Sequence, residues 1–396
     1  MSASTFRRIT GVLFLILVVG FGYLAGLLTA MRALPGYPAD TADVAPTALL
    51  DEAWQRVDAH FIGTLPTTQT RVYAAIRGML GSLNDPYTIL IDPPAAQLEN
   101  DQLRGSFGGI GADLRRDAEG RTVLSPYPDG PAATAGVLDG DQLTAIDGAP
   151  VVPEQRLDEI EARLRGEVGS DVRLGLARVG QALDVHMTRA EIAPPSVMWR
   201  MIDTTPTIGY IYIRGFTDRT TSEVRQAVDE LRQRGMRSVI LDLRDNGGGL
   251  LQSAVDVAGQ FVDGLVMIEA HRDGSEQPFV APLDGAARDV PLVILINHST
   301  ASASEIVAGA LRDRKQVKLI GERTYGKGSV QNVYPLSDGS SLHVTTSEWY
   351  TPNRAKLTGL GLLPDIEVIR TAEDRAAGRD PVLDRAVEYL QVTGSR

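Results

Sequence analysis

A serine and a lysine 25 positions apart each lie in a local sequence that suits catalysis. Ser302 follows the apolar run 290–296 and precedes a helical pattern, so we expect it where a buried strand passes into a helix N-terminus. Unpaired N–H groups and the helix dipole favour an anionic oxygen there. Lys327 has a glycine on each side, which lets the backbone approach closely. Because a lysine activates a serine only when neutral, the pair predicts a small, dry pocket that lowers the lysine pKa.

Each residue also has an ordinary structural explanation. Ser302 and Glu305 match a helix capping box, in which the serine caps the helix and the glutamate reaches back. A Gly-Lys-Gly segment is more often a solvated turn than a catalytic site. A third segment, 241–249, favours the chemical interpretation. Three glycines at the end of an apolar strand can present backbone N–H groups to a ligand and supply an oxyanion donor.

Together the three segments resemble those of the carboxyl-terminal processing proteases, which are serine–lysine peptidases that carry a PDZ domain. The resemblance covers the chain from about residue 45 to its end. It implies that Ser302 is the nucleophile, that Lys327 is the general base and that Gln331 orients the lysine. It also implies an oxyanion hole formed by the backbone N–H groups of Gly248 and Ala303.

The serine motif departs from the family pattern at two positions. Ser299 and Thr300 stand where the family usually has glycine and serine. Thr300 is a mild change, whereas Ser299 could narrow the loop because it replaces a glycine.

The expected mechanism follows from these roles. Neutral Lys327 takes the proton of Ser302 as the hydroxyl attacks the scissile carbonyl, which gives an acyl-enzyme, and then returns the proton to the leaving amine. Lowering a lysine pKa from ~10.4 to about 7–8 disfavours the charged form by roughly 3–5 kcal/mol, so burial has to dominate.

Other catalytic schemes fit the sequence less well. The five histidines show no metal-binding spacing and the chain has no cysteine, so no metal site is expected. His298 or His343 could in principle serve a Ser-His-Asp triad, but the chain lacks a G-x-S-x-G motif. It also lacks a P-loop and a dinucleotide-binding G-x-G-x-x-G, and no cofactor is expected.

The length and net charge of the chain limit the number of domains and the classes of partner. The chain has 396 residues, enough for two to three domains with real cores. Its net charge of −11, without a long basic block, argues against nucleic acid as a partner.

The N-terminus predicts a membrane anchor. Arg7 and Arg8 precede an uncharged apolar stretch at 9–30, which is long enough to span a bilayer. The paired arginines are expected to stay in the cytoplasm, which places the catalytic part of this single-pass protein outside, in the periplasm or at the cell exterior. Because residues 28–30 match a cleavage site poorly, we favour an uncleaved signal anchor over secretion after cleavage.

A PDZ module is expected in the middle of the chain. Gly109, Ile110, Gly111 and Ala112 look like the PDZ loop that captures a terminal carboxylate while the peptide adds as a strand. A partner motif follows at 131–148, and the helix that lines the groove is expected at 151–164. Ala112 stands where the family loop usually has an aromatic residue, which implies a roomier pocket for the last side chain.

The remaining pattern predicts the fold class α/β, within a multidomain α+β chain. Strands and helices alternate from residue 208 to residue 320, which indicates parallel pairing, and a hairpin at 330–346 and a helix at 380–392 follow. The family resemblance adds a crotonase- and Clp-protease-like core. The expected segments are a signal anchor (1–32), a linker (33–46), a helical region (47–98), the PDZ domain (99–189), the protease core (190–370) and a C-terminal helix (371–396).

The sequence thus predicts a membrane-anchored extracytoplasmic serine endopeptidase that acts near protein C-termini. The resemblance suggests apolar C-terminal tails as substrates and a homodimer as an option. Two other classes stay open. One is a catalytically silent PDZ adaptor, and the other, weaker one is a crotonase-type acyl-CoA enzyme.

Overall fold

The computed structural model describes residues 46–393, which fall into two compact units, one ending at Val72 and the other beginning at Tyr73. The predicted signal anchor at 1–32 and the linker up to residue 45 lie outside the described residues. Within the described range, no helix is both long and apolar enough to cross a membrane.

The first unit consists of helix α2 (Pro46–His60) and the beginning of α3 (Thr68–Gly81). The guanidinium of Arg71 lies 5.0 Å from the ring centroid of Trp54 and also pairs with Asp58. These contacts tie the start of α3 to α2. The helical character predicted for this stretch is confirmed.

The second unit begins within α3 and continues through β1 (Ile89–Ile91) and α4 (Pro93–Arg104). The helical region predicted at 47–98 also contains the strand β1, which was not predicted and in which Ile89 pairs with His343 in an antiparallel ladder. Pro86 and Pro93 bracket this short segment, and proline does not fit a helix interior. Its strand partner lies far away in the sequence, so local periodicity gives no sign of the pairing.

Residues 107–192 form a small β domain with a core of its own. The sheet order is β3-β4-β5-β7-β8, so β3 is an edge strand. Helix α6 begins at Leu157 and not at residue 151 as predicted, because the residue before Pro153 is disfavoured in the helical region. The elements are β2 (Phe107–Gly109), β3 (Ala112–Arg116), β4 (Thr122–Pro126), α5 (Pro131–Thr134), β5 (Gln142–Ile146), β6 (Ala149–Pro150), α6 (Leu157–Leu164), β7 (Asp171–Arg178), β8 (Gln181–Thr188) and β9 (Ala190–Ile192).

A second sheet forms the centre of the larger α/β core. Among the described residues it has six strands in the order β10-β11-β12-β15-β16-β19. β10 and β11 pair antiparallel, and all later neighbours pair parallel, as the alternation of strands and helices predicts. The strands are β10 (Val197–Ile202), β11 (Thr205–Ile213), β12 (Ser238–Asp242), β15 (Leu292–Ile296), β16 (Lys318–Gly321) and β19 (Ile366–Glu367).

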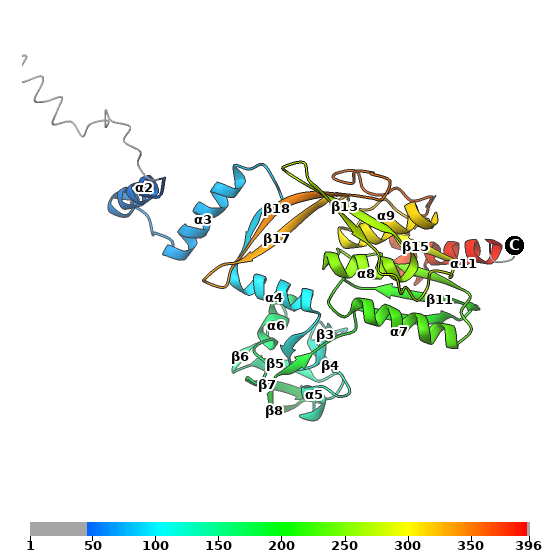
Figure 1. Cartoon of the computed structure of the whole chain (residues 1–396). Coiled ribbons are helices and arrows are strands. Elements are labelled where there is room, and N and C mark those ends of the chain that lie inside the picture. Colours follow the sequence, from blue (N-terminus) through cyan, green and yellow to red (C-terminus); the bar gives the residue numbers. More distant parts are fainter. Residues whose placement is uncertain (1–45, 394–396) are drawn as a thin grey trace, which may run out of the picture. The chain divides into compact units, whose positions relative to one another are not determined.

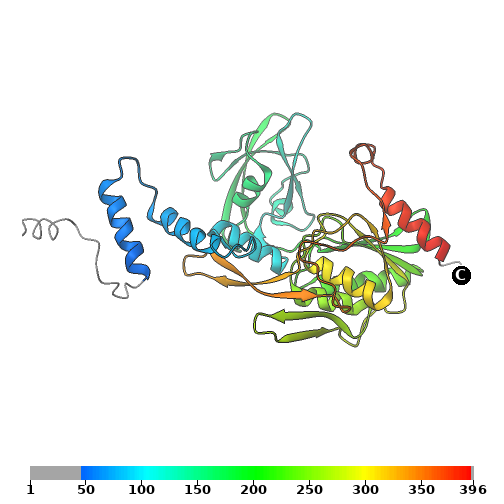
Figure 2. The same cartoon turned by 90° about the horizontal axis from the view of Figure 1, so that it is seen from above.

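Helices cover both faces of this sheet (Figure 1). α7 (Thr220–Gln233), α8 (Leu251–Phe261) and α9 (Ala303–Lys315) share one core with Leu241 and Ile294. α11 (Pro381–Thr393) packs on the opposite face with Ile240 and Val293, after the short α10 (Ala372–Ala376). Figure 2 shows α9 and α11 from above, separated by the strands. Neighbouring residues of a strand face opposite helices, which is the two-residue period of a sheet.

A separate antiparallel sheet flanks the core. It contains β1 together with β13 (Leu265–His271), β14 (Glu276–Val280), β17 (Ser329–Pro335) and β18 (Ser341–Tyr350). The β17–β18 hairpin turns at Asp338 and Gly339, as the sequence predicts. This hairpin carries Gln331 and follows directly on Lys327.

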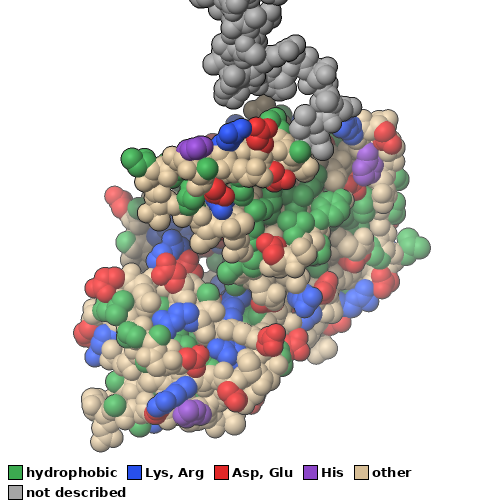
Figure 3. All heavy atoms as spheres, turned by 90° about the vertical axis from the view of Figure 1, so that its left-hand side faces the viewer, with side chains coloured by type: hydrophobic (Ala, Val, Ile, Leu, Met, Phe, Trp, Pro, Cys, Tyr) green, Lys and Arg blue, Asp and Glu red, His purple; other side chains and the backbone are tan. Residues whose placement is uncertain are grey.

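Charges of both signs mix on the protein surface. Figure 3 shows acidic and basic side chains interspersed on one face, around a broad hydrophobic patch. Exposed ion pairs such as Arg121–Asp117 and Arg354–Glu276 belong to this mixture. Pairs of this kind contribute little to stability, because water screens them.

Candidate active site

Ser302 lies at a sharp turn between β15 and α9. Its backbone adopts φ 54° and ψ −119°, a conformation that non-glycine residues rarely populate. The loop before it is fixed by buried Thr300, whose hydroxyl donates to the Leu243 carbonyl at 2.9 Å and accepts the N–H of Asn297 at 3.0 Å. The strained turn projects Ser302 at the start of a helix, where backbone N–H groups have no intrahelical acceptor.

Ser299, which replaces the family glycine, does not distort this loop. Its φ angle lies outside the left-handed region, and its N–H donates to the side-chain oxygen of Asn297 at 3.1 Å. A glycine is therefore not needed here on conformational grounds.

The glycine loop after β12 is held against the serine turn by Asn246. This fully buried amide donates to the Ile213 carbonyl at 2.9 Å, and its side-chain oxygen accepts the N–H of Gly248 at 2.9 Å. The Asn246 carbonyl accepts the N–H of Ala301 at 3.0 Å and the hydroxyl of Ser304 at 2.9 Å. One residue thus connects the two loops through both its side chain and its backbone.

Gly248 lies directly beside the serine. A Cβ atom added at this glycine would be 2.9 Å from the Cβ of Ser302 and 3.1 Å from the nitrogen of Ala303, and its φ of 110° suits only glycine. The structure therefore brings Gly248, Ser302 and Ala303 together. The Gly248 N–H points to Asn246 in this state.

A buried carboxylate, that of Glu305, connects the serine turn to the lysine loop. It accepts the N–H of Ser302 at 2.9 Å, the N–H of Lys327 at 2.9 Å and the N–H of Gly326 at 2.8 Å. The Thr324 hydroxyl also donates to it. Ser302 and Glu305 form the expected capping box, in which the Glu305 carboxylate accepts the N–H of Ser302, and the N–H of Glu305 also donates to the Ser302 carbonyl at 2.8 Å.

The Lys327 side chain lies in an apolar environment with one acidic neighbour. Burial lowers its pKa below the ordinary lysine value, and the carboxylate of Glu99 on α4 opposes that shift. The Nζ atom lies 5.4 Å from the ring centroid of Tyr87. Burial thus favours the neutral amine that general-base catalysis requires.

Gln331 does not contact the lysine in this state. Its amide donates to the Ser329 hydroxyl at 2.7 Å and to the Thr345 hydroxyl at 3.4 Å. Across the described part of the chain, no hydrogen bond joins the side chains of Ser302, Lys327 and Gln331. Catalytic hydrogen bonds are often long in unliganded enzymes and tighten with substrate.

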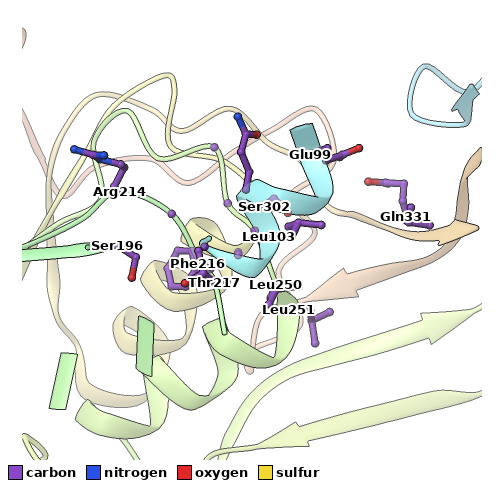
Figure 4. Close-up of a pocket in the computed structure, with 18 of the residues that line it drawn as sticks. Glu99, Leu103, Ser196, Arg214, Phe216, Thr217, Leu250, Leu251, Ser302 and Gln331 are labelled. Atoms are coloured by element: carbon purple, nitrogen blue, oxygen red, sulfur yellow. The ribbon is translucent and has the colours of Figure 1, made fainter. Parts of the chain in front are cut away.

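All five residues predicted for catalysis line one cavity of about 720 Å³. They are Gly248, Ser302, Ala303, Lys327 and Gln331. Figure 4 shows that helix α4 also faces this cavity, with Glu99 and Leu103, and that Phe216, Thr217 and Leu250 lie around its floor. The cavity is large enough for a stretch of extended peptide.

One of the two histidines considered for a triad, His343, lines the same cavity as Ser302. His298 is exposed, and the Nε2 atom of buried His343 lies 2.9 Å from a carboxylate oxygen of Glu99. No hydrogen bond links either of them to Ser302 within the described residues.

The predicted carboxylate-binding loop lies at the open edge of the small β domain. Gly109 ends β2 and Ala112 begins the edge strand β3. The carbonyls of Ile110 and Gly111 accept the N–H groups of Ala132 and Tyr127, each at 2.8 Å, which fixes the loop. The Ile110 side chain belongs to the domain core.

Three residues with a place in the site escaped the sequence interpretation. In the sequence, Glu305 stands out only as a helix cap, Asn246 lies only within the segment 241–249, and Tyr87 belongs to none of the motifs described above. Each acts through partners that are distant in the sequence, so no local pattern reveals it.

Comparisons with known proteins agree with this arrangement. A model of peptidase family S41 matches residues 207–368, and a PDZ domain model matches residues 122–178. The carboxy-terminal-processing protease of Bartonella bacilliformis is 35% identical over 344 residues, which cover 85% of this chain and 78% of the relative. The carboxyl-terminal-processing protease of Synechocystis sp. is 36% identical over 302 residues, which cover 74% of this chain and 70% of the relative.

A solved structure from Bacteroides fragilis, provisionally assigned to the S41 proteases, shares the fold. It has 17% identity and a TM-score of 0.54, and the alignment covers 91% of this chain and 99% of that one. Both domain models and both relatives thus lead to the same conclusion: the chain belongs to peptidase family S41, as a serine-type carboxyl-terminal-processing peptidase with a PDZ domain.

Proposed function

We propose that this S41 peptidase is a membrane-anchored endopeptidase of the extracytoplasmic space and that Ser302 and Lys327 form its catalytic pair. One observation carries the catalytic part of the proposal. Buried Glu305 accepts the backbone N–H groups of both residues, so that the turn bearing the serine and the loop bearing the lysine are held as one unit.

In the proposed reaction, the Oγ atom of Ser302 attacks the scissile carbonyl while its proton passes to the Nζ atom of Lys327. Lys327 then gives this proton to the leaving amine, and an acyl-enzyme remains. Water, activated by the same lysine, releases the acyl group. The backbone N–H groups of Gly248 and Ala303 stabilise the oxyanion, and loss of one such donor costs about 100–1,000-fold in turnover.

The described state requires three local changes before this reaction. The Lys327 amine has to form a hydrogen bond with the Ser302 hydroxyl, and the Gly248 peptide has to turn its N–H away from Asn246. Gln331 is positioned to orient the lysine only after it releases the hydroxyls of Ser329 and Thr345. We infer that a bound substrate brings these changes about.

The PDZ domain is proposed to recognise the C-terminal tails of substrate proteins. The edge strand β3 is open for an added strand, and α6 lies beside it. A peptide ending in apolar residues should bind with its free carboxylate, whereas the same peptide with an amidated C-terminus should bind at least tenfold more weakly. Equal affinity of the two peptides would contradict carboxylate capture.

The membrane part of the proposal rests on the apolar stretch at 9–30. It predicts that the full-length protein fractionates with membranes and resists extraction by salt and by alkaline carbonate. Recovery of a shortened protein from the soluble extracytoplasmic fraction would instead indicate secretion after cleavage.

The experiment that tests the catalytic proposal uses a serine-reactive fluorophosphonate probe and the full-length protein. The probe should label the wild type but neither Ser302→Ala nor Lys327→Ala, and both variants should lose hydrolysis of unfolded proteins with apolar C-termini. Cut sites mapped by mass spectrometry give the position of cleavage relative to the C-terminus. Hydrolysis by either variant at the wild-type rate would refute the Ser–Lys mechanism.

The alternatives give different results in the same assays. A silent PDZ adaptor would bind tails without being labelled by the probe. A crotonase-type enzyme would turn over CoA thioesters. Belonging to family S41 argues against both.

A further inference from the structure

Hydrogen bonds fix the turn at Asn84–Thr88 to strand β18. The Asp85 carboxylate accepts the hydroxyl of Thr88 at 2.6 Å and the N–H of Tyr87 at 3.2 Å. The Thr88 hydroxyl in turn accepts the N–H of Thr345 on β18 at 3.1 Å. The turn is thereby fixed to the strand opposite Gln331, whose Cα partner is Thr345.

This fixed turn places the ring of Tyr87 against the catalytic lysine. The centroid of the ring lies 5.4 Å from the Nζ atom of Lys327, within the range of a cation–π contact. Burial and a hydrogen bond with Tyr325 raise the pKa of the Tyr87 hydroxyl, so the ring stays neutral over the working pH range. Its face therefore acts on the lysine through its quadrupole and not through a charge.

The other ionisable groups around the lysine act differently. Glu99, on α4, is an acidic neighbour that raises the pKa of Lys327, and it also approaches His343 on β18. Glu305, on α9, accepts the backbone N–H of the lysine. Tyr325, two residues before the lysine, bonds to Tyr87.

We propose that Tyr87 is a positioning residue for Lys327. The face of the Tyr87 ring stabilises the ammonium that forms when the lysine takes the Ser302 proton. The inference rests on the Ser–Lys mechanism proposed above. An aromatic face attracts a cation but donates nothing to the lone pair of the neutral amine. The lone pair stays available for the serine hydroxyl, and the positive charge is stabilised once the proton arrives. A carboxylate in the same place would keep the lysine protonated and remove the base.

The test compares pH profiles of kcat/KM for the full-length wild type, Tyr87→Phe and Tyr87→Leu. Loss of the ring in Tyr87→Leu should reduce the plateau value of kcat/KM about 3- to 30-fold, which corresponds to the free energy of a cation–π contact. It should also move the acid limb to lower pH by about half a unit to one unit, because the ammonium loses a stabilising neighbour. Tyr87→Phe keeps the ring and should retain the wild-type profile. Tyr334→Leu, an exposed tyrosine on β17, is the control for a lost tyrosine.

A series of fluorinated phenylalanines at position 87 guards against misfolding of Tyr87→Leu. Each fluorine weakens the cation–π attraction while the shape of the ring is kept, so the acid limb should move stepwise with fluorine number. An unchanged acid limb across the series would reduce Tyr87 to a structural role and overturn the proposal. A gain in turnover of Tyr87→Leu would also overturn it, since the ring would then be holding the lysine away from Ser302.

Failure of the underlying mechanism gives a separate result. If Ser302→Ala and Lys327→Ala keep their activity, the Ser–Lys mechanism is refuted, and so is the proposed role of Tyr87. If both variants are inactive and the Tyr87 series leaves the acid limb in place, only the role of Tyr87 is refuted.

Discussion

The carboxylate of Glu305 accepts the backbone N–H of Lys327 at 2.9 Å, although the two residues lie on different elements. The same carboxylate oxygen accepts the N–H of Ser302. Because Glu305 is fully buried, the bonds are protected from competition by water. Glu305 thus helps to set the separation of these two backbone segments, together with the N–H of Tyr325, which donates to the Thr300 carbonyl at 3.0 Å.

The first prediction concerns this carboxylate. Glu305→Gln replaces one accepting oxygen by an amide donor, which has to face an N–H group, so the serine turn and the lysine loop should move apart. Because a displacement of about 1 Å can cost about 100-fold, kcat/KM should fall by that order. The exposed Glu388→Gln on α11 is the control. Wild-type kcat/KM in Glu305→Gln would show that its contacts are not needed for catalysis.

Two neighbouring glycines give a matched pair of variants. Gly248→Ala places a Cβ 2.9 Å from Ser302 at a φ of 110°, and it should abolish turnover. Gly247→Ala meets no atom within 4 Å and should keep most of the activity. The comparison uses kcat/KM together with the thermal unfolding midpoint. Similar losses in both variants would mean that loop flexibility, and not the space beside Ser302, is limiting.

The pH dependence of activity should reflect burial of the lysine. A general base works in its deprotonated form, so kcat/KM should rise as pH increases through the Lys327 pKa, and burial places this rise below the ordinary lysine value. Glu99→Gln removes the carboxylate that raises this pKa, and the rise should therefore move to lower pH. A move to higher pH would contradict the assignment of Glu99 as a neighbour of the base.

A stability prediction concerns the attachment of the C-terminal helix. Arg244 pairs with buried Asp242 and with Asp380 just before α11, and its side chain is only 13% exposed. Removing one partner of a buried pair typically costs 3–5 kcal/mol, and we expect about 2–3 kcal/mol for Asp380→Ala because Asp380 is 22% exposed. Asp384→Ala, at an exposed position of the same helix, is the control, and urea unfolding is the measurement. A change within the error of the control would mean that packing alone holds α11.

The sequence predicts the elements of the core well because each carries its own pattern. Buried strands such as β12 and β15 are short apolar runs, and α7 and α9 have helical spacing, so the alternation that leads to a parallel sheet is visible locally. The β17–β18 hairpin is equally visible, since Asp338-Gly339 is a strong turn signal.

What the sequence does not show depends on long-range contacts. β1 forms because it pairs with β18, which is distant in the sequence. The strands β13 and β14 contain polar residues such as Glu269, which interrupt the apolar pattern expected of a buried strand. In the site, Ser302 and Lys327 stand out through their local motifs. The functions of Asn246 and Glu305 lie in bonds to residues up to 58 and 22 positions away, which no short segment encodes.

The backbone angles of Ser302 carry a further consequence. Glycine adopts φ 54° and ψ −119° without difficulty, whereas a serine there costs about 1–3 kcal/mol. Replacing Ser302 by glycine should therefore raise the melting temperature while it silences the enzyme. At this position thermal stability and the proposed catalysis are opposed, so a screen for thermostability alone would select against the proposed nucleophile.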